Sequence, residues 1–203
     1  MFKPVAQSPL HALAAASRTS GSDSRDGVVA YEMPLLGYIS LRGNAGDAAF
    51  MDATARILGI AIPTEPCTFA RSDTQILLWL SPDEWMIVCP RENLDSQLRD
   101  LGQALAGTRH QLIDNSGGYT QVRLHGPNAI AVLRHASVYD FSALGPGRVV
   151  GTTFGKSSVY IYRLDDAFCL LLRRSFADYI WRFLARAAEP YGFHVTEPAE
   201  TSP

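Results

Sequence analysis

The spacing of hydrophobic residues changes along the chain, and these changes predict alternating strands and helices. Residues 35–42 form an apolar and aromatic run typical of a strand. Residues 45–58 then place apolar side chains three or four positions apart, which indicates a helix. In order, the first half predicts a strand at 35–42, a helix at 45–58, a loop at 59–74, hairpin strands at 75–80 and 84–89, a helix at 93–106 and a strand at 110–114.

The second half of the chain predicts the same order of elements. Pro127 suits the first turn of one helix, and Ser175 and Pro190 suit the start and the end of another. The predicted elements are a strand at 119–125, a helix at 127–136, a loop at 140–151, hairpin strands at 157–163 and 167–173, a helix after Ser175 and a strand at 193–195.

The two halves also match each other as a repeat. A shift of 83 residues aligns Leu41-Arg42-Gly43 with Leu124-His125-Gly126 and brings the predicted elements into register. The fold class predicted is α+β, with two tandem ferredoxin-like β-α-β-β-α-β units packed together. The predicted domains are an arm and linker at 1–27, a first repeat at 28–114, and a second repeat with the tail at 115–203.

The predicted sheets need cover on both faces. Helices would cover one face, but the hairpin strands at 76–80 and 85–89 are apolar on both sides. We therefore expect the two sheets to pack on each other or on another subunit. The N-terminal arm is predicted to form a short helix with Ser8 as its N-cap and Pro9 at its first position, free to pack on a neighbour.

Composition excludes several classes of function. The net charge is −2 and no basic stripe occurs, which argues against nucleic acid or anionic lipid as the main partner. No apolar run approaches the roughly 18 residues of a membrane span. The three cysteines do not have metal-ligand spacing, and Cys89 and Cys169 lie in apolar runs typical of buried strands. A reducing, cytoplasmic location is the expectation.

Few residues suggest chemistry. No GxGxxG or GxSxG sequence occurs, and the five histidines are scattered. Asp114 precedes a glycine-containing loop, where it would serve either as a general base or as the start of an Asx turn. Arg173 and Arg174 would bind a carboxylate, a phosphate or an acidic group of a partner protein. Asp114, Arg173 and Arg174 are thus the weak candidates for cofactor binding; no catalytic or metal-binding residue is predicted.

Six short motifs along the chain are informative when taken together. They are Ser8-Pro9-Leu10, Leu80-Ser-Pro-Asp-Glu-Trp85, Asp114-Asn-Ser-Gly-Gly-Tyr119, Leu124-His-Gly-Pro127, Asp140-Phe141 and Arg173-Arg-Ser-Phe-Ala-Asp-Tyr179. Together they resemble the motifs of a known family, the gamma subunits of heterotetrameric sarcosine oxidase. The hairpin motif is also similar to that of folate-dependent aminomethyltransferases, whereas the N-terminal motif and the Arg-Arg-Ser-Phe-Ala motif are more specific.

The resemblance implies a subunit without its own redox centre, whose fold is similar to the N-terminal region of the aminomethyltransferases. In that family the complex oxidises the N-methyl group of sarcosine, giving glycine, hydrogen peroxide and either formaldehyde or methylene-tetrahydrofolate. The implied partners are alpha, beta and delta subunits, which hold FAD, FMN, NAD, the tetrahydrofolate site and zinc. This chain would bind no cofactor alone and would stabilise the flavin-bearing core.

An alternative of a different class remains open. The chain would then be an independent one-carbon enzyme of the aminomethyltransferase type, binding folate near Asp114, Arg173 and Arg174. Folate binding by the lone chain, lost in Asp114→Asn without loss of the fold, discriminates this enzyme from the structural subunit.

Overall fold

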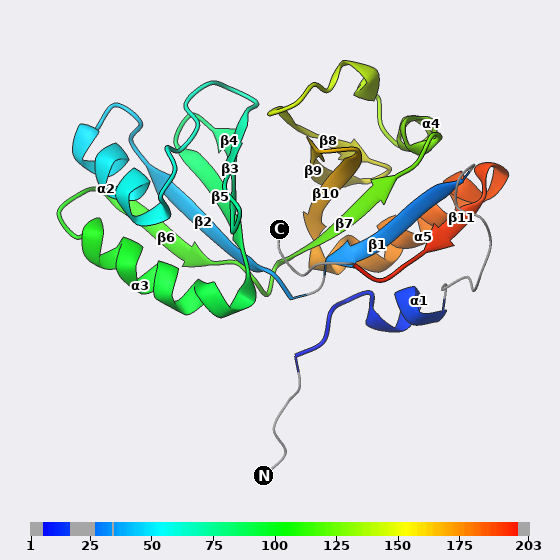
Figure 1. Cartoon of the computed structure of the whole chain (residues 1–203), viewed down its shortest axis with the longest axis horizontal. Helices are drawn as coiled ribbons and strands as arrows, with labels where there is room; N and C mark the ends of the chain where they lie inside the picture. The colour runs from blue at the N-terminus through cyan, green and yellow to red at the C-terminus, as the bar shows by residue number, and fades with distance from the viewer. Residues whose placement is uncertain (1–5, 17–26, 34, 199–203) are drawn as a thin grey trace, which may run out of the picture. The chain divides into compact units, whose positions relative to one another are not determined.

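The computed structural model describes residues 6–16, 27–33 and 35–198. These residues form two compact units (Figure 1). Unit 1 comprises the described residues up to Leu35 together with 118–146 and the chain from Val150 onward. Unit 2 comprises 36–117 and 147–149. The structure is therefore α+β, with one β-sheet in each unit.

Unit 2 contains a five-stranded antiparallel sheet in the order β3-β4-β5-β2-β6. Its helices α2 (Ala48–Leu58) and α3 (Leu94–Ala104) pack side chains into one core with Ile39, Leu77 and Trp85 of the sheet. The strands are β2 (Gly37–Gly43), β3 (Phe69–Arg71), β4 (Ile76–Ser81), β5 (Glu84–Cys89) and β6 (His110–Asp114).

Local sequence explains where helix α2 begins and how closely it approaches the sheet. The Asp47 carboxylate accepts hydrogen bonds from the backbone N–H groups of Ala49 (2.9 Å) and Phe50 (3.4 Å), which caps the helix. Gly43 lies under the Phe50 ring, and a Cβ added there would come within 2.3 Å of a ring carbon. Glycine at the end of β2 is thus required for the helix to pack on the strand.

Unit 1 contains a six-stranded sheet in the order β11-β1-β7-β10-β9-β8. Strand β1 runs antiparallel to β7 and parallel to β11. Helix α5 contributes Trp181 and Leu184 to the core, and helix α4 contributes Leu133. The elements are α1 (His11–Ala16), β1 (Val28–Met33), β7 (Tyr119–His125), α4 (Ala129–Arg134), β8 (Val149–Phe154), β9 (Ser157–Leu164), β10 (Ala167–Arg173), α5 (Ala177–Ala188) and β11 (Phe193–Val195).

The structure contains three strands that the sequence pattern did not predict. Strand β1 pairs with β7 and β11, so residues 28–33 belong to unit 1 rather than to the repeat predicted at 28–114. Strand β3 lies in the predicted loop 59–74, and β8 begins in the predicted loop 140–151. Strand β3 is only three residues long, and β8 has buried residues only at its two ends, so neither gives a strong apolar run.

Both faces of the sheets carry buried side chains, as the sequence predicted. In unit 2, Ile39 and Ile87 belong to the core that contains the helices. Neighbouring residues on the opposite side of the same strands, such as Tyr38, Met86 and Val88, are also at most 1% exposed.

The N-terminal arm packs on unit 1 of its own chain, and its contact with a neighbouring subunit stays a prediction. Leu10 is fully buried in the core of unit 1. The Ser8 hydroxyl donates to the Glu32 carboxylate, to which Thr120 also donates (2.7 Å). The Ser8 hydroxyl is therefore hydrogen-bonded to Glu32 rather than to the helix, and helix α1 begins only at His11. The predicted N-cap role of Ser8 is wrong.

Replacing Leu10 tests whether the arm is part of the fold. Leu10→Ala should lower the free energy of unfolding by about 2–4 kcal/mol, because it leaves a cavity in the core. The matched control is His11→Ala, at an exposed neighbouring position that should change stability by less than about 0.5 kcal/mol. Urea denaturation measures both, and equal midpoints for the two variants would contradict the buried position of the arm.

Candidate functional site

Asp114, the first of the predicted site residues, forms a turn. It is the last residue of β6 and is exposed, and its Oδ1 accepts a hydrogen bond from the Ser116 backbone N–H (2.8 Å). The Ser116 hydroxyl accepts in turn from the Tyr38 backbone N–H (3.0 Å). The Asx-turn interpretation of Asp114 is therefore confirmed, whereas a role in cofactor binding stays a prediction.

The two predicted arginines, Arg173 and Arg174, have different surroundings within unit 1. Arg173 ends β10 directly opposite Tyr119 of β7, and its guanidinium carbon lies 5.3 Å from the centroid of the Tyr119 ring. Arg174 donates from its side chain to the Gln7 carbonyl of the N-terminal arm and from its backbone N–H to Gly118 (2.9 Å). Arg174 therefore holds the arm, and Arg173 alone faces a candidate site.

Ser175 does not cap the helix that follows. It lies inside a short 3₁₀ turn, Arg174–Phe176, and neither this turn nor α5 has a side-chain cap. The predicted N-cap is therefore wrong, because the 3₁₀ turn moves the helix start to Ala177. Asp178 is in the first turn of α5 as predicted, and it pairs with Arg182 one turn later (3.0 Å).

A hollow of about 540 Å³ lies beside Arg173 in unit 1. Its volume is in the range typical of ligand-binding clefts. Gly151 leaves room for the Tyr160 ring, since an added Cβ would come within 3.2 Å of that ring. The hollow is lined by Tyr119, Val138, Gly151, Thr152, Thr153, Ser158, Val159, Tyr160, Leu171 and Arg173.

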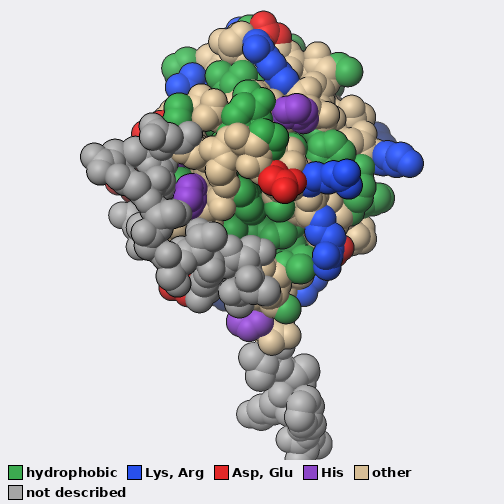
Figure 2. Space-filling model, turned by 90° about the vertical axis from the view of Figure 1, so that its right-hand side faces the viewer, with side chains coloured by type: hydrophobic (Ala, Val, Ile, Leu, Met, Phe, Trp, Pro, Cys, Tyr) green, Lys and Arg blue, Asp and Glu red, His purple; other side chains and the backbone are tan. Residues whose placement is uncertain are grey.

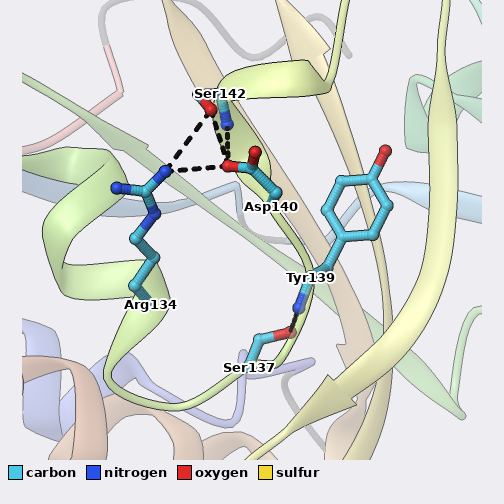
Figure 3. Close-up of polar contacts among 5 residues, drawn as sticks. All are labelled: Arg134, Ser137, Tyr139, Asp140 and Ser142. Carbon is cyan, nitrogen blue, oxygen red and sulfur yellow. Dashed lines mark hydrogen bonds and ion pairs between the residues drawn. The ribbon is translucent and has the colours of Figure 1, made fainter.

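The loop that carries Val138 is braced by polar contacts (Figure 3). The Asp140 carboxylate accepts from the hydroxyl of Ser142 (2.6 Å), its backbone N–H (3.1 Å) and the Arg134 guanidinium (2.8 Å). At the other end of the loop, the Ser137 hydroxyl bonds to the Thr152 hydroxyl (3.1 Å) and accepts from the Tyr139 backbone N–H (3.4 Å). Both sides of Val138 are thus fixed.

Hydrogen bonds lower the pKa of Asp140. The bond from the Ser142 hydroxyl and then that from Arg134 hold the pKa of this carboxyl at about 2, below its ordinary value of 3.8. The carboxylate is exposed, so this shift reflects its hydrogen bonds rather than burial. Asp140 therefore remains ionised, and able to brace the loop, at any physiological pH.

Two of the three cysteines are buried within the strands, as predicted. Burial raises the pKa of the Cys89 thiol to about 12 and that of the Cys169 thiol to about 11. Cys67 is exposed. Cys89 and Cys169 therefore act as small hydrophobic residues rather than as nucleophiles.

Two further hollows occur away from Arg173. One of about 580 Å³ in unit 2 contains both basic and acidic groups, including the Arg42–Asp83 ion pair (2.9 Å). Another of about 430 Å³ lies at α4 and α5 of unit 1, lined by His135, Phe183, Arg186, Ala187 and Pro190. On the side of the molecule drawn in Figure 2, Lys and Arg side chains are interspersed with hydrophobic and uncharged ones rather than joined in a basic stripe.

None of the described helices combines the length and hydropathy needed to cross a bilayer. Within residues 6–16, 27–33 and 35–198, His, Cys, Asp and Glu side chains form no group of three or more with the geometry to hold a metal ion.

Comparison with known proteins identifies the family. The model of the sarcosine oxidase, gamma subunit family matches residues 42–189. The chain belongs to this family. It is similar to the sarcosine oxidase subunit gamma of Arthrobacter sp., with 31% identity over 144 residues, 70% of this chain and 68% of the relative.

Solved structures agree with the family assignment. The gamma-family chain superposes on a chain of the heterotetrameric sarcosine oxidase from Corynebacterium sp. U-96, in complex with pyrrole 2-carboxylate, with a TM-score of 0.83 and 25% identity. That match covers 92% of this chain and 96% of the other. Aminomethyltransferase T from Bartonella henselae shares the fold, with a TM-score of 0.67, 16% identity and coverage of 92% of this chain and 58% of its own.

The carboxyl group of Asp140 should titrate abnormally. In the wild-type chain, carbon-detected NMR should give a midpoint of about 2. Ser142→Ala should raise the midpoint more than Arg134→Ala, because the Ser142 hydroxyl makes the larger contribution. The stabilisation from these bonds is fully present above the ordinary pKa of 3.8 and is lost as pH falls through about 2. A wild-type midpoint near 3.8 would show that the brace is absent.

The cysteines should differ in reactivity. A disulfide reagent such as DTNB should label Cys67 quickly in the native chain, and Cys89 and Cys169 only after denaturation. Cys67→Ser should remove the fast phase and leave the slow one. Rapid labelling of this variant would contradict the buried positions of the other two thiols.

Proposed function

We propose that the chain is the gamma subunit of a heterotetrameric sarcosine oxidase, which oxidises the N-methyl group of sarcosine and releases hydrogen peroxide. The observation that carries the proposal is the structural match to a chain of such an oxidase, since it covers nearly all of both chains at a TM-score of 0.83. The family match over residues 42–189 supports the same assignment independently.

In this proposal the chain is a non-catalytic subunit of a cytoplasmic complex. The alpha, beta and delta subunits hold FAD, FMN, NAD, tetrahydrofolate and zinc, and the products are glycine, hydrogen peroxide and formaldehyde or methylene-tetrahydrofolate. The contacts of the polar residues support a structural role. Asp114 forms a turn, Arg174 holds the arm, and Glu32 binds two hydroxyl groups inside unit 1.

The chain also shares its fold with aminomethyltransferases. We propose that the two sheets descend from one ferredoxin-like β-α-β-β-α-β unit. In unit 2 the order β4-β5-β2-β6 is that of such a unit, with β3 added at the edge. In unit 1 the order β9-β10-β7-β11 is equivalent, except that β1 is inserted between β7 and β11 and β8 is added at the edge.

Purification of the tagged chain tests the proposed function. Isolated from its source organism at low salt, the chain should carry with it larger subunits with flavin absorption, and the preparation should release peroxide on addition of sarcosine. The same chain expressed alone should be colourless and inactive, which is the control for activity of its own.

Two outcomes would contradict the proposed function. A solitary, colourless native chain that binds tetrahydrofolate, with binding lost in Asp114→Asn but the fold retained, would replace the subunit assignment with the aminomethyltransferase alternative. Peroxide release by the chain expressed alone would contradict the non-catalytic role.

A further inference from the structure

The hollow beside Arg173 has the composition of a protein-binding site. Two tyrosines, Tyr119 and Tyr160, lie with one arginine among small hydroxyl and apolar residues. Tyrosine and arginine are enriched at protein interfaces and account for a large share of their binding energy. Both tyrosines are only partly buried.

Charge in the hollow is of one sign. Arg173 is the one charged group among the described residues that line it. The side chain is exposed, and none of the ion pairs among the described residues includes it. The guanidinium carbon lies 5.3 Å from the centroid of the Tyr119 ring, and the guanidinium N–H groups can donate to a carboxylate.

The rim of the hollow presents a hydrophobic side chain on a fixed loop. Val138 is 96% exposed. The Asp140 brace on one side and the Ser137–Thr152 hydrogen bond on the other hold the loop in place (Figure 3). A fixed loop loses little conformational entropy on binding, so an exposed valine here is suited to contact with a partner.

We propose that this hollow docks a partner subunit of the oxidase, which inserts an acidic side chain against Arg173 and rests an apolar side chain on Val138. The inference depends on the proposed function, because it requires a partner subunit. Charge complementarity selects the occupant, since a single cation beside aromatic and hydroxyl groups matches a carboxylate. The exposed hydroxyls of Thr153 and Ser158 can donate to the same carboxylate or to nearby carbonyl groups of the partner.

The test compares assembly of the complex from chains that differ at Arg173. The tagged chain is first expressed together with the other subunits to establish that it joins the complex. The dissociation constant between the separately purified chain and the complex of the remaining subunits is then measured at two salt concentrations. Arg173→Leu should weaken binding about tenfold or more, since it leaves the partner carboxylate without its cation. Arg173→Lys should recover part of the loss and retain the salt dependence that Arg173→Leu removes.

The remaining variants separate a local effect from a general one. Val138→Asp should also weaken binding relative to the wild-type chain, because it places an acidic group beside the partner carboxylate. Arg182→Leu is the matched control, since it removes an exposed arginine of α5 in the same unit, and it should leave binding within about twofold of wild type. Thermal unfolding of each free chain establishes that the fold is intact.

The outcomes also distinguish the inference from the proposed function. If the wild-type chain joins the complex and Arg173→Leu binds as tightly, the docking site is overturned and the subunit assignment stands. If the wild-type chain joins no flavoprotein, both are overturned. If acetate shifts the Arg173 side-chain NMR signals but Arg173→Leu leaves the dissociation constant of the complex unchanged, the hollow is a site for small carboxylates and the docking proposal is wrong. Dimerisation of the free chain that Arg173→Leu abolishes would instead assign the hollow to a second copy.

Discussion

The register of strand β7 is the constraint on which unit 1 depends. This strand pairs with β1 on one side and β10 on the other, so its register decides which residues share a face. It places Tyr119 opposite Arg173 and points Thr120 to the other side, where it binds Glu32. A slip of one residue would exchange these faces, burying Tyr119 in the helical core and moving Thr120 away from the carboxylate.

Two interactions make such a slip costly. On the helical face, Val122 and Leu124 of β7 are fully buried in the core, so exchanging the faces would replace them with polar side chains. On the same side, the nearly buried Glu32 carboxylate needs the hydroxyls of Thr120 and Ser8, because a buried carboxylate without donors is strongly destabilising. The hydrogen bonds to Glu32 therefore connect the N-terminal arm, β1 and β7. They help to hold the register of β7, and that register places Tyr119 beside Arg173 in the hollow.

The sequence predicted those parts of the fold that depend on local patterns. Strands 110–114, 119–125 and 167–173 have the predicted bounds because each is an alternating or apolar run between turn residues. Strand β1 was not predicted, although it is largely buried, because the repeat that guided the interpretation has no equivalent of it. Its place depends on pairing with residues about 90 positions later, which no local pattern records.

The candidate site, like the fold, could be predicted from the sequence only where local patterns determine it. Arg173 could be selected from its residue type and its position at a strand end, but the sequence could not distinguish it from Arg174. The difference arises because Arg173 is the last residue of β10, beside Tyr119, whereas Arg174 begins the 3₁₀ turn, and only the fold shows that the N-terminal arm meets Arg174. Asp140 and Phe141 entered the sequence analysis as a family motif without a physical role. The structure gives them one, since Asp140 fixes the loop of Val138 while Phe141 is fully buried in the core beneath it.

Most of the polar residues discussed above bind other groups of the same chain. The Asp114, Glu32 and Asp140 carboxylates each bind groups of the chain itself, and the Cys89 and Cys169 thiols are buried with raised pKa values. The carboxylates thus stabilise a turn, the N-terminal arm and a loop, and the two thiols pack as small hydrophobic groups. Arg173 differs because it is exposed, close to an aromatic ring and surrounded in its hollow by uncharged groups. An arginine in these surroundings gains most from a carboxylate supplied by another molecule, which in the proposed complex would be a partner subunit.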